Sequence, residues 1–175
     1  MVLQTKRLLL RPFLEADAPQ IYLLARDPRI GCAAGWQPHK SVEESRSIIR
    51  HILSAEGTFA VVDRQSGKVM GSIGIKKANV GLTVPDDQPE IGYWLGADYW
   101  GQGLIPEAVQ TILSYCFDTL GTTAVWCGYY DGNEKSKRVQ EKCGFVPSHS
   151  IEMDVPLLNE RRLCHFSRIT SWQYK

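Results

Sequence analysis

The sequence has no apolar run that approaches the ~20 residues a helix needs to cross a bilayer. Its N-terminal apolar stretch is short and interrupted by arginines, so we expect neither a signal peptide nor an association with a membrane. The sequence also has no excess of either charge: it contains 20 basic and 19 acidic residues, and its net charge is +1. No long basic run exists. The electrostatic footprint of a nucleic-acid-binding protein is therefore missing, and we expect no direct binding to nucleic acid.

Disulfide and metal-binding patterns are also missing. The five cysteines are odd in number and no two have C-x-x-C spacing, while the four histidines form no H-x-x-x-H pair. This usage disfavours a disulfide framework and a zinc site, and we predict no metal cofactor. Cys116 and Cys143 fall on apolar faces and are interpreted as small core residues. A reducing cytoplasm is the compartment that the cysteines favour.

What the chain does contain is an ordinary globular composition, with 43% hydrophobic and 22% charged residues over 175 positions. This length can bury a sizeable core, so we expect residues 1–175 to form one domain. The expected elements come in the order strands, helix, strand, helix, strands. That order predicts a mixed α/β (α+β) fold.

Apolar periodicity and turn residues mark the expected elements. Ser41 and the glutamate three residues later predict a capping box at one helix start. Pro106 and Gly121 favour the start and the end of another helix. Segments 27–40 and 79–89 are rich in turn residues and are expected to be loops. The expected strands cover 7–12, 59–63, 69–75, 89–95, 124–130, 145–155 and 162–172, and the expected helices cover 15–25, a stretch after Ser41, 105–120 and 133–143.

The segment from Asp98 to Gly103 lies between an expected strand and an expected helix and contains two glycines. Glycine lets the backbone approach a ligand, and the free N–H groups of a helix N-terminus favour a phosphate. A plain tight turn is the simpler interpretation of the same residues. The segment is not a Walker loop, because Gly-Lys-Ser/Thr is missing. It is not a dinucleotide fingerprint either, because the third glycine and the acidic partner are missing.

A second pattern, Asn133-x-x-Ser136, opens an expected helix. Taken alone, Asn133 is an N-cap and Ser136 a solvent-facing residue of the first turn. Together with E-I-G-Y-W-L from Glu90 and Y-W-G-Q-G from Tyr99, this pattern resembles the GNAT superfamily of acyl-CoA-dependent N-acyltransferases. Within it, the chain is most similar to the ribosomal-protein N-terminal acetyltransferase branch, the RimJ/RimL type. The resemblance covers nearly the whole chain and is specific between Glu90 and Phe145.

The resemblance implies a fold and a cofactor site. The GNAT fold has a mixed, mostly antiparallel central sheet flanked by helices, here splayed at the strand that ends near Gly96. Acetyl-CoA would be the co-substrate, with its pantetheine arm along this strand and its pyrophosphate on the amides of the glycine loop and helix start. For the Trp94 side chain, a core aromatic is the alternative. The implied cofactor-binding residues are Trp94, Leu95, Gly96, Trp100, Gly101, Gln102, Gly103, Leu104, Ile105, Asn133 and Ser136.

Catalytic roles follow from the same resemblance. Many family members carry a tyrosine seven residues after the asparagine to protonate the departing thiolate, but this chain has Gln140 there. Ser136 is then the implied donor to the leaving sulfur, directly or through water. Tyr129 and Tyr130 are reserve donors whose alternative is to pack or to line the cleft. Glu90 is the implied general base, and a structural strand carboxylate is its alternative.

One aromatic residue is implied on the acceptor side. Trp36, followed by Pro38 and the helix start at Ser41, resembles the region that shapes the acceptor pocket in the Rim-type branch. We therefore interpret Trp36 as a substrate-binding residue, with a packing lid as the alternative.

The resulting hypothesis is an N-acetyltransferase that moves an acetyl group to a primary amine, on a protein N-terminus or a small molecule, by direct attack in a ternary complex. Cys143 as an acyl-carrying nucleophile is the enzymatic alternative, but no histidine stands at motif distance to activate it. A non-catalytic acyl-CoA-binding or interaction module on the same fold is an alternative from another class, and a nucleotide-phosphate binder is a third. The identity of the acceptor and the choice between monomer and homodimer stay open.

Overall fold

The computed structural model describes residues 1–174 of the chain. Its centre is an eight-stranded sheet in the order β1-β2-β3-β4-β5-β6-β8-β7. All neighbouring strands are antiparallel except β5 and β6, which confirms the predicted mixed and mostly antiparallel sheet. The strands are β1 (Leu3–Gln4), β2 (Leu8–Arg11), β3 (Thr58–Asp63), β4 (Val69–Lys77), β5 (Pro89–Leu95), β6 (Ala124–Tyr130), β7 (Val146–Val155) and β8 (Glu160–Thr170).

Helical segments fill the connections between strands. The α-helices are α1 (Ala18–Ala25), α2 (Pro28–Ala34), α3 (Val42–Ile48), α4 (Leu104–Ser114), α5 (Glu134–Lys142) and α6 (Ser171–Tyr174). The short 3-10 segments are η1 (Glu15–Asp17), η3 (Ala97–Tyr99) and η5 (Pro156–Leu158), and π-helical turns η2 (Ile49–Leu53) and η4 (Tyr115–Thr119) extend α3 and α4. Among residues 1–174, no helix is long and apolar enough to cross a membrane.

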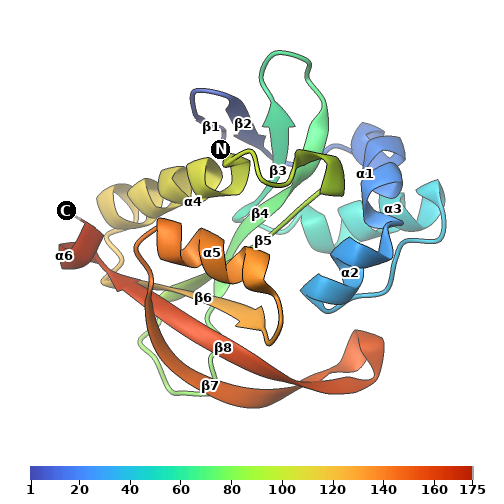
Figure 1. The fold of residues 1–175 in the computed structure, drawn as a ribbon. Coiled ribbons are helices and arrows are strands. Elements are labelled where there is room, and N and C mark those ends of the chain that lie inside the picture. Colours follow the sequence, from blue (N-terminus) through green and yellow to red (C-terminus); the bar gives the residue numbers. More distant parts are fainter. Residues whose placement is uncertain (175) are drawn as a thin grey trace.

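Helices cover both faces of the sheet (Figure 1). On one face α4 and α5 lie side by side, and on the other α1 packs against α3. Alternate residues of a strand point to opposite faces, and β3 shows the consequence. Val61 packs in the core that contains α4, whereas Ala60 and Val62 pack in the core that contains α1 and α3. Since β3 is buried on both faces, it is almost continuously apolar.

One expected loop contains a helix. The sequence prediction for 27–40 was wrong over α2, which begins directly after Asp27. The Asp27 carboxylate accepts the Arg29 N–H at 2.9 Å, and Pro28 occupies the first turn, where its missing N–H costs nothing. Gly35 ends the helix at φ 90°. These are ordinary helix signals, but the helix is so short that no apolar period made it visible.

At the ends of several other helices and strands, the structure differs from the sequence prediction by a few residues or in one capping contact. The Ser41 hydroxyl accepts the Glu44 N–H at 3.0 Å as predicted, but the Glu44 carboxylate reaches the Lys40 N–H rather than that of Ser41. The last expected strand stops at Thr170, and Trp172 lies in α6. Leu120, the last residue of the expected helix 105–120, lies beyond the end of η4 and is 49% exposed.

The parallel pair β5 and β6 separates soon after it forms. The register joins only Glu90 to Trp126 and Ile91 to Cys127, although β5 continues to Leu95. The strands therefore diverge over the second half of β5, where the resemblance to the GNAT superfamily implied a splay. The divergence leaves one backbone edge of β5 without a strand partner.

Candidate functional site

A cleft of about 780 Å³ opens where β5 and β6 diverge. Its walls come from β5, β6, α2, the loop before α4, and α5. Three of the predicted site residues, Trp36, Gly96 and Gln102, do not line it. The others do: Glu90, Trp94, Leu95, Trp100, Gly101, Gly103, Leu104, Ile105, Asn133 and Ser136. The tertiary structure thus brings both sequence patterns to one cavity.

The free edge of β5 faces the cleft with a defined set of backbone groups. Gly96 donates its N–H to the Met70 carbonyl at 2.8 Å, on the β4 side. Backbone groups alternate sides along a strand, so the N–H and C=O of Leu95 face the gap. The Leu95 carbonyl already accepts the Trp100 indole N–H at 2.8 Å. Leu95, rather than Gly96, therefore presents a backbone N–H to the cleft.

The loop before α4 depends on two glycines with left-handed backbone conformations. Gly101 has φ 76° and Gly103 has φ 72°. A Cβ at Gly101 would meet nothing within 4 Å, and one at Gly103 would meet only Arg7, 3.7 Å away. Backbone conformation rather than space requires glycine here. The loop leads into α4 at Leu104, and Ile105 follows in a first turn whose N–H groups have no intrahelical acceptor.

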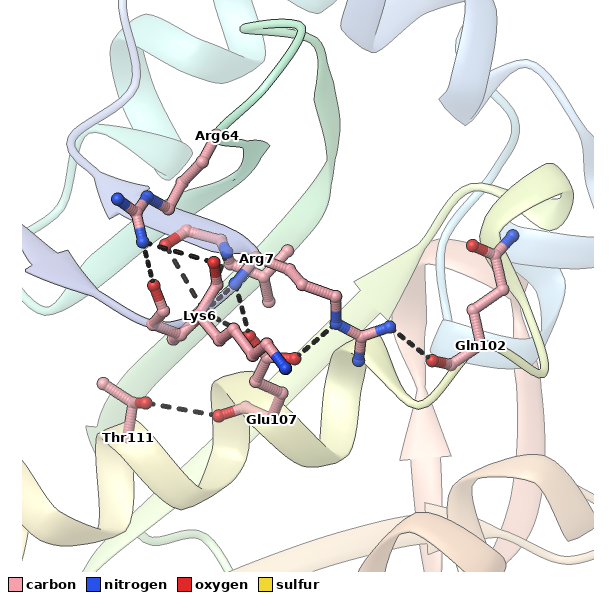
Figure 2. Close-up of polar contacts among 8 residues, drawn as sticks. Lys6, Arg7, Arg64, Gln102, Glu107 and Thr111 are labelled. Carbon is pink, nitrogen blue, oxygen red and sulfur yellow. Dashed lines mark hydrogen bonds and ion pairs between the residues drawn. The ribbon is translucent and has the colours of Figure 1, made fainter.

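Arg7, which directly precedes β2, holds this loop in place through two contacts (Figure 2). Its Nε donates to Glu107 at 2.6 Å and its Nη1 donates to the Gln102 carbonyl at 2.9 Å. Burial acts to raise the pKa of Glu107, but hydrogen bonds from Thr5 and Arg7 outweigh it and lower that pKa below its usual value. A carboxylate in the first turn of α4 thus joins the loop and the helix to the sheet edge. Gln102 serves this brace through its backbone.

The wall opposite the loop is cationic. Lys135 Nζ lies 4.3 Å from the Trp100 ring and the Arg29 guanidinium 5.8 Å from it, so the indole lies between α5 and α2. Lys135, Arg138 and Lys142 all line the cleft from α5. Within residues 1–174, none of these three α5 side chains takes part in an ion pair. The cleft therefore offers uncompensated positive charge beside the N-terminus of α4.

Asn133 and Ser136 lie at the start of α5, where the cap interpretation of Asn133 is confirmed. The Asn133 side-chain oxygen accepts the Ser136 N–H at 3.1 Å. Its amide nitrogen donates to the Ala33 carbonyl of α2 at 3.5 Å. Ser136 is half-buried and lines the cleft, where its hydroxyl lies 2.9 Å from the hydroxyl of Tyr93 of β5.

Gln140 occupies the position where many GNAT enzymes have a tyrosine, and it does not line the cleft. It is 3% exposed, and its side-chain oxygen accepts the Ser167 hydroxyl. Its Nε2 is buried without a hydrogen-bond partner in residues 1–174. A buried orphan donor is uncommon and calls for a physical reason.

Glu90 is a buried carboxylate whose two oxygens both have partners. Lys76, its cross-strand neighbour, lies 3.1 Å from one oxygen, and the Asn79 N–H donates to the other at 3.2 Å. The side chain is only 8% exposed but lines the cleft. The geometry supports both a structural and a chemical role for this residue.

Trp36 and Trp94 pack against each other behind the cleft wall. Their ring centroids are 5.7 Å apart in an edge-to-face arrangement, and His39 lies 5.3 Å from the Trp36 ring. Trp94 belongs to the core of α1 and α3, which supports the core-aromatic interpretation of its side chain. Trp36 supports the wall near Tyr130, whose hydroxyl lies close to Gly35.

Neither Cys143 nor Cys164 is activated as a nucleophile. Cys143 is 2% exposed, lies outside the cleft lining, and has its pKa raised to about 11 by burial. Cys164 lines the cleft, but burial raises its pKa to about 11 as well. At pH 7 such a thiol is ~10⁻⁴ thiolate, and the thiolate is the nucleophile. The acyl-carrying cysteine alternative therefore receives no support.

Two residues that the sequence analysis did not single out belong to this arrangement. Tyr93 stands inside the E-I-G-Y-W-L pattern, and its place one residue from Trp94 puts it on the opposite face of β5. Arg7 is distant in sequence from the loop that it braces. The alternation along β5 could have revealed Tyr93, whereas no local pattern could have revealed Arg7.

Comparison with known proteins gives a consistent result. A protein-family model described as "Acetyltransferase (GNAT) domain" matches residues 7–146. Among curated proteins, the chain is 30% identical over 128 residues to the uncharacterized N-acetyltransferase p20 of Bacillus licheniformis, with 70% of each chain covered.

Two solved structures share the fold. The ribosomal-protein-S5-alanine acetyltransferase from Vibrio fischeri superposes with a TM-score of 0.75 at 20% identity, covering 100% of this chain and 99% of that one. The spermidine N-acetyltransferase from Vibrio cholerae, solved with CoA and spermine, superposes with a TM-score of 0.76 at 19% identity, covering 96% of this chain and 98% of that one.

Proposed function

The chain belongs to the GNAT family of acetyltransferases and is an N-acetyltransferase, and from this premise we propose that it transfers the acetyl group of acetyl-CoA to a primary amine by direct attack in a ternary complex. The observation that carries the proposal is the cleft itself. There the unpaired edge of β5, a glycine loop at a helix N-terminus and the start of α5 converge.

The residues of the cleft fit acetyl-CoA. The first-turn N–H groups at Leu104 and Ile105 favour a pyrophosphate, and the left-handed Gly101 and Gly103 open the loop toward it. The three uncompensated cations of α5 add attraction for phosphate. The Leu95 carbonyl, which faces the gap, can accept from a pantetheine amide as an added strand would.

The attacking amine must be neutral, and this requirement favours one acceptor class. Deprotonating an α-amine of pKa ~7.7 at pH 7 costs about 1 kcal/mol, while a lysine amine of pKa ~10.4 costs about 4.6 kcal/mol. We propose a protein N-terminus as the acceptor; the Vibrio fischeri enzyme is likewise named for a protein substrate, an alanine of ribosomal protein S5. A polyamine, the ligand class of the Vibrio cholerae enzyme, is the competing small-molecule acceptor.

In this proposal Leu95, Glu90 and Ser136 each have one role in the reaction. The Leu95 N–H donates to the thioester oxygen as it gains charge. Glu90 draws in the cationic acceptor and takes its proton through water, because Lys76 and Asn79 already hold both carboxylate oxygens. The C–S bond breaks as the amide bond forms, and the Ser136 hydroxyl donates to the departing sulfur. The proton that nitrogen loses balances the one that the free thiol gains.

Calorimetric titration of acetyl-CoA tests the cofactor half of the proposal. Gly103→Glu places a side chain and a negative charge beside the N-terminus of α4, so we expect at least a hundredfold loss of affinity. Gly121→Glu is the matched control: Gly121 also has a positive φ, 67°, and a Cβ there would meet nothing within 4 Å. Equal losses in both variants, or no binding to the wild-type protein, would contradict the proposed site.

Release of free CoA thiol tests the transfer half. We expect release with a short peptide that begins with alanine or serine, and none with the same peptide after N-terminal blocking. Release with spermidine but not with the peptide would reassign the acceptor. Tight acetyl-CoA binding with no release for any amine would instead favour the non-catalytic binding module.

A further inference from the structure

The cleft holds a pair of hydroxyl groups of which the mechanism above uses only one. Tyr93 projects from the free half of β5, and its hydroxyl lies 2.9 Å from Ser136 Oγ and 3.2 Å from the Ser136 carbonyl oxygen. Ser136 belongs to α5, so the pair spans the gap between the diverging walls. Both residues line the cleft. The phenol of Tyr93 therefore reaches the leaving-group side of the site from β5, on the wall opposite α5.

The orphan amide of Gln140 lies beside the same phenol. Gln140 Nε2 is buried without a partner among the described residues, while its side-chain oxygen is fixed by Ser167. The Gln140 side chain acts to lower the pKa of Tyr93, as a hydrogen-bond donor to the phenol oxygen does, although burial outweighs it. Gln140 thus offers a donor to the Tyr93 oxygen.

We propose that Tyr93 is a positioning residue for acetyl transfer: its hydroxyl donates to Ser136 Oγ and thereby turns the Ser136 proton toward the sulfur of the departing CoA. The proposal rests on the proposed function. The donors then run in one direction, from Gln140 through Tyr93 and Ser136 to sulfur. Each hydrogen bond in such a chain polarises the next, so the serine becomes a better donor than it is alone. Tyr93 on β5 thus provides a phenol in place of the tyrosine that many GNAT enzymes have at the position of Gln140.

Tyr93 remains a donor at any working pH. Burial raises its pKa well above 10, and the Ser136 and Gln140 hydrogen bonds only partly oppose that shift. The phenol keeps its proton, and no proton leaves Tyr93 during turnover. As the C–S bond breaks, sulfur takes the electron pair and the Ser136 O–H stabilises the thiolate. The solvent proton that completes the free thiol is matched by the one that the amine nitrogen loses.

A purely structural role is the competing explanation, because the single Tyr93 hydroxyl proton can go to the Ser136 carbonyl, 3.2 Å away, instead of to Ser136 Oγ, and the tyrosine would then only hold α5 in place. A double-mutant cycle with Tyr93→Phe and Ser136→Ala separates the two. Tyr174→Phe is the matched control: the Tyr174 hydroxyl also bonds a helix carbonyl, that of Gln110 at 3.3 Å, and a helix serine, Ser114 at 3.2 Å. That pair lies outside the cleft.

We expect Tyr93→Phe to lower kcat about tenfold and Ser136→Ala about a hundredfold, with the acetyl-CoA dissociation constant within twofold of wild type. The double variant should be no slower than Ser136→Ala, since Tyr93 acts only through that hydroxyl. Tyr174→Phe should keep the wild-type kcat.

A wild-type kcat in Tyr93→Phe would overturn the inference and leave the proposed function standing, and so would a double variant whose loss equals the product of the single losses. A Tyr93→Phe variant that weakens acetyl-CoA binding in proportion to kcat would also overturn it in favour of the structural role. A wild-type protein that binds no acetyl-CoA, or releases no thiol with any amine, would instead overturn the proposed function itself and this inference with it.

Discussion

The two ends of the cleft are built differently. The end at the N-terminus of α4 comes from one nearly continuous segment, Glu90 to Glu107, which Arg7 braces through the Gln102 carbonyl and Glu107. The other end is assembled from parts distant in sequence: Asn79, the end of β6, and Met153 with its neighbour on β7. Apart from Arg7, the residues of the first end are close together in the sequence, so local sequence patterns identify them. The second depends on how separate segments meet, so it is where acceptor specificity can change without altering the cofactor site.

Trp36→Ala should have the largest effect, and it should change acceptor binding without changing acetyl-CoA binding. Trp36 packs edge-to-face on Trp94 and contacts His39, so truncation should lower the free energy of unfolding by about 2–3 kcal/mol. Assayed below its melting temperature, the variant should show an acceptor KM raised severalfold and a wild-type affinity for acetyl-CoA. Chemical denaturation and initial rates measure both. Trp172→Ala, at a residue 74% exposed, should change neither. An equal loss of acetyl-CoA affinity would erase the distinction between the ends.

Arg7→Ala tests the brace at the cofactor end. Removing the guanidinium frees the Gln102 carbonyl and leaves Glu107 with fewer donors, so the loop loses its preorganised shape. We expect about tenfold weaker acetyl-CoA binding, equivalent to about 1.4 kcal/mol, with little change in acceptor KM. Arg64→Ala is the control, because Arg64 donates to the Thr5 and Lys6 carbonyls but not to the loop. If the two variants weaken binding alike, the loop does not depend on Arg7.

Substitution of His39, near Trp36 at the acceptor end, should have the smallest effect, a change in how stability depends on pH. Burial lowers its pKa from the usual 6.5, against an opposing influence of Glu44, so the folded state resists a proton that the unfolded state accepts. The stability contribution is therefore present above about pH 6.5 and is lost as the pH falls from there toward the folded pKa. Thermal melts between pH 7.5 and 5.5 should show a larger fall for wild type than for His39→Gln. Parallel melting curves would show that His39 does not titrate with unfolding.

Sequence reasoning succeeded where the signal is local. The strand 89–95, the glycine loop, the amphipathic α4 and the Asn133 cap each depend on residues within a few positions of one another, and each was found. It failed at α2, because a helix of two turns has caps but almost no apolar period. The side-chain roles of the predicted site residues are proposals that the geometry accommodates, and three of those residues lie outside the cleft lining.

Gly96 shows that a residue can lie next to cleft residues in the sequence without presenting its backbone N–H to the cleft. It lies between Leu95 and the loop, but its N–H is committed to Met70 and a Cβ there would come within 2.6 Å of Leu24. The strand register, which a single sequence does not state, decides which of two adjacent amides faces the gap. The same register places Tyr93 toward α5 and Trp94 toward Trp36.

By itself, the sequence determined the fold class, the order of the main strands and helices, and the short motif that marks the family, because periodicity, caps and glycine conformations act over a few residues. Only the tertiary structure decided that Tyr93 meets Ser136 across the splay, that Arg7 braces a loop distant in sequence, and that Trp36 lies behind the wall rather than in the cleft. These contacts join segments whose separation is set by the divergence of β5 from β6. That divergence is a property of the whole sheet and of the helices packed on it.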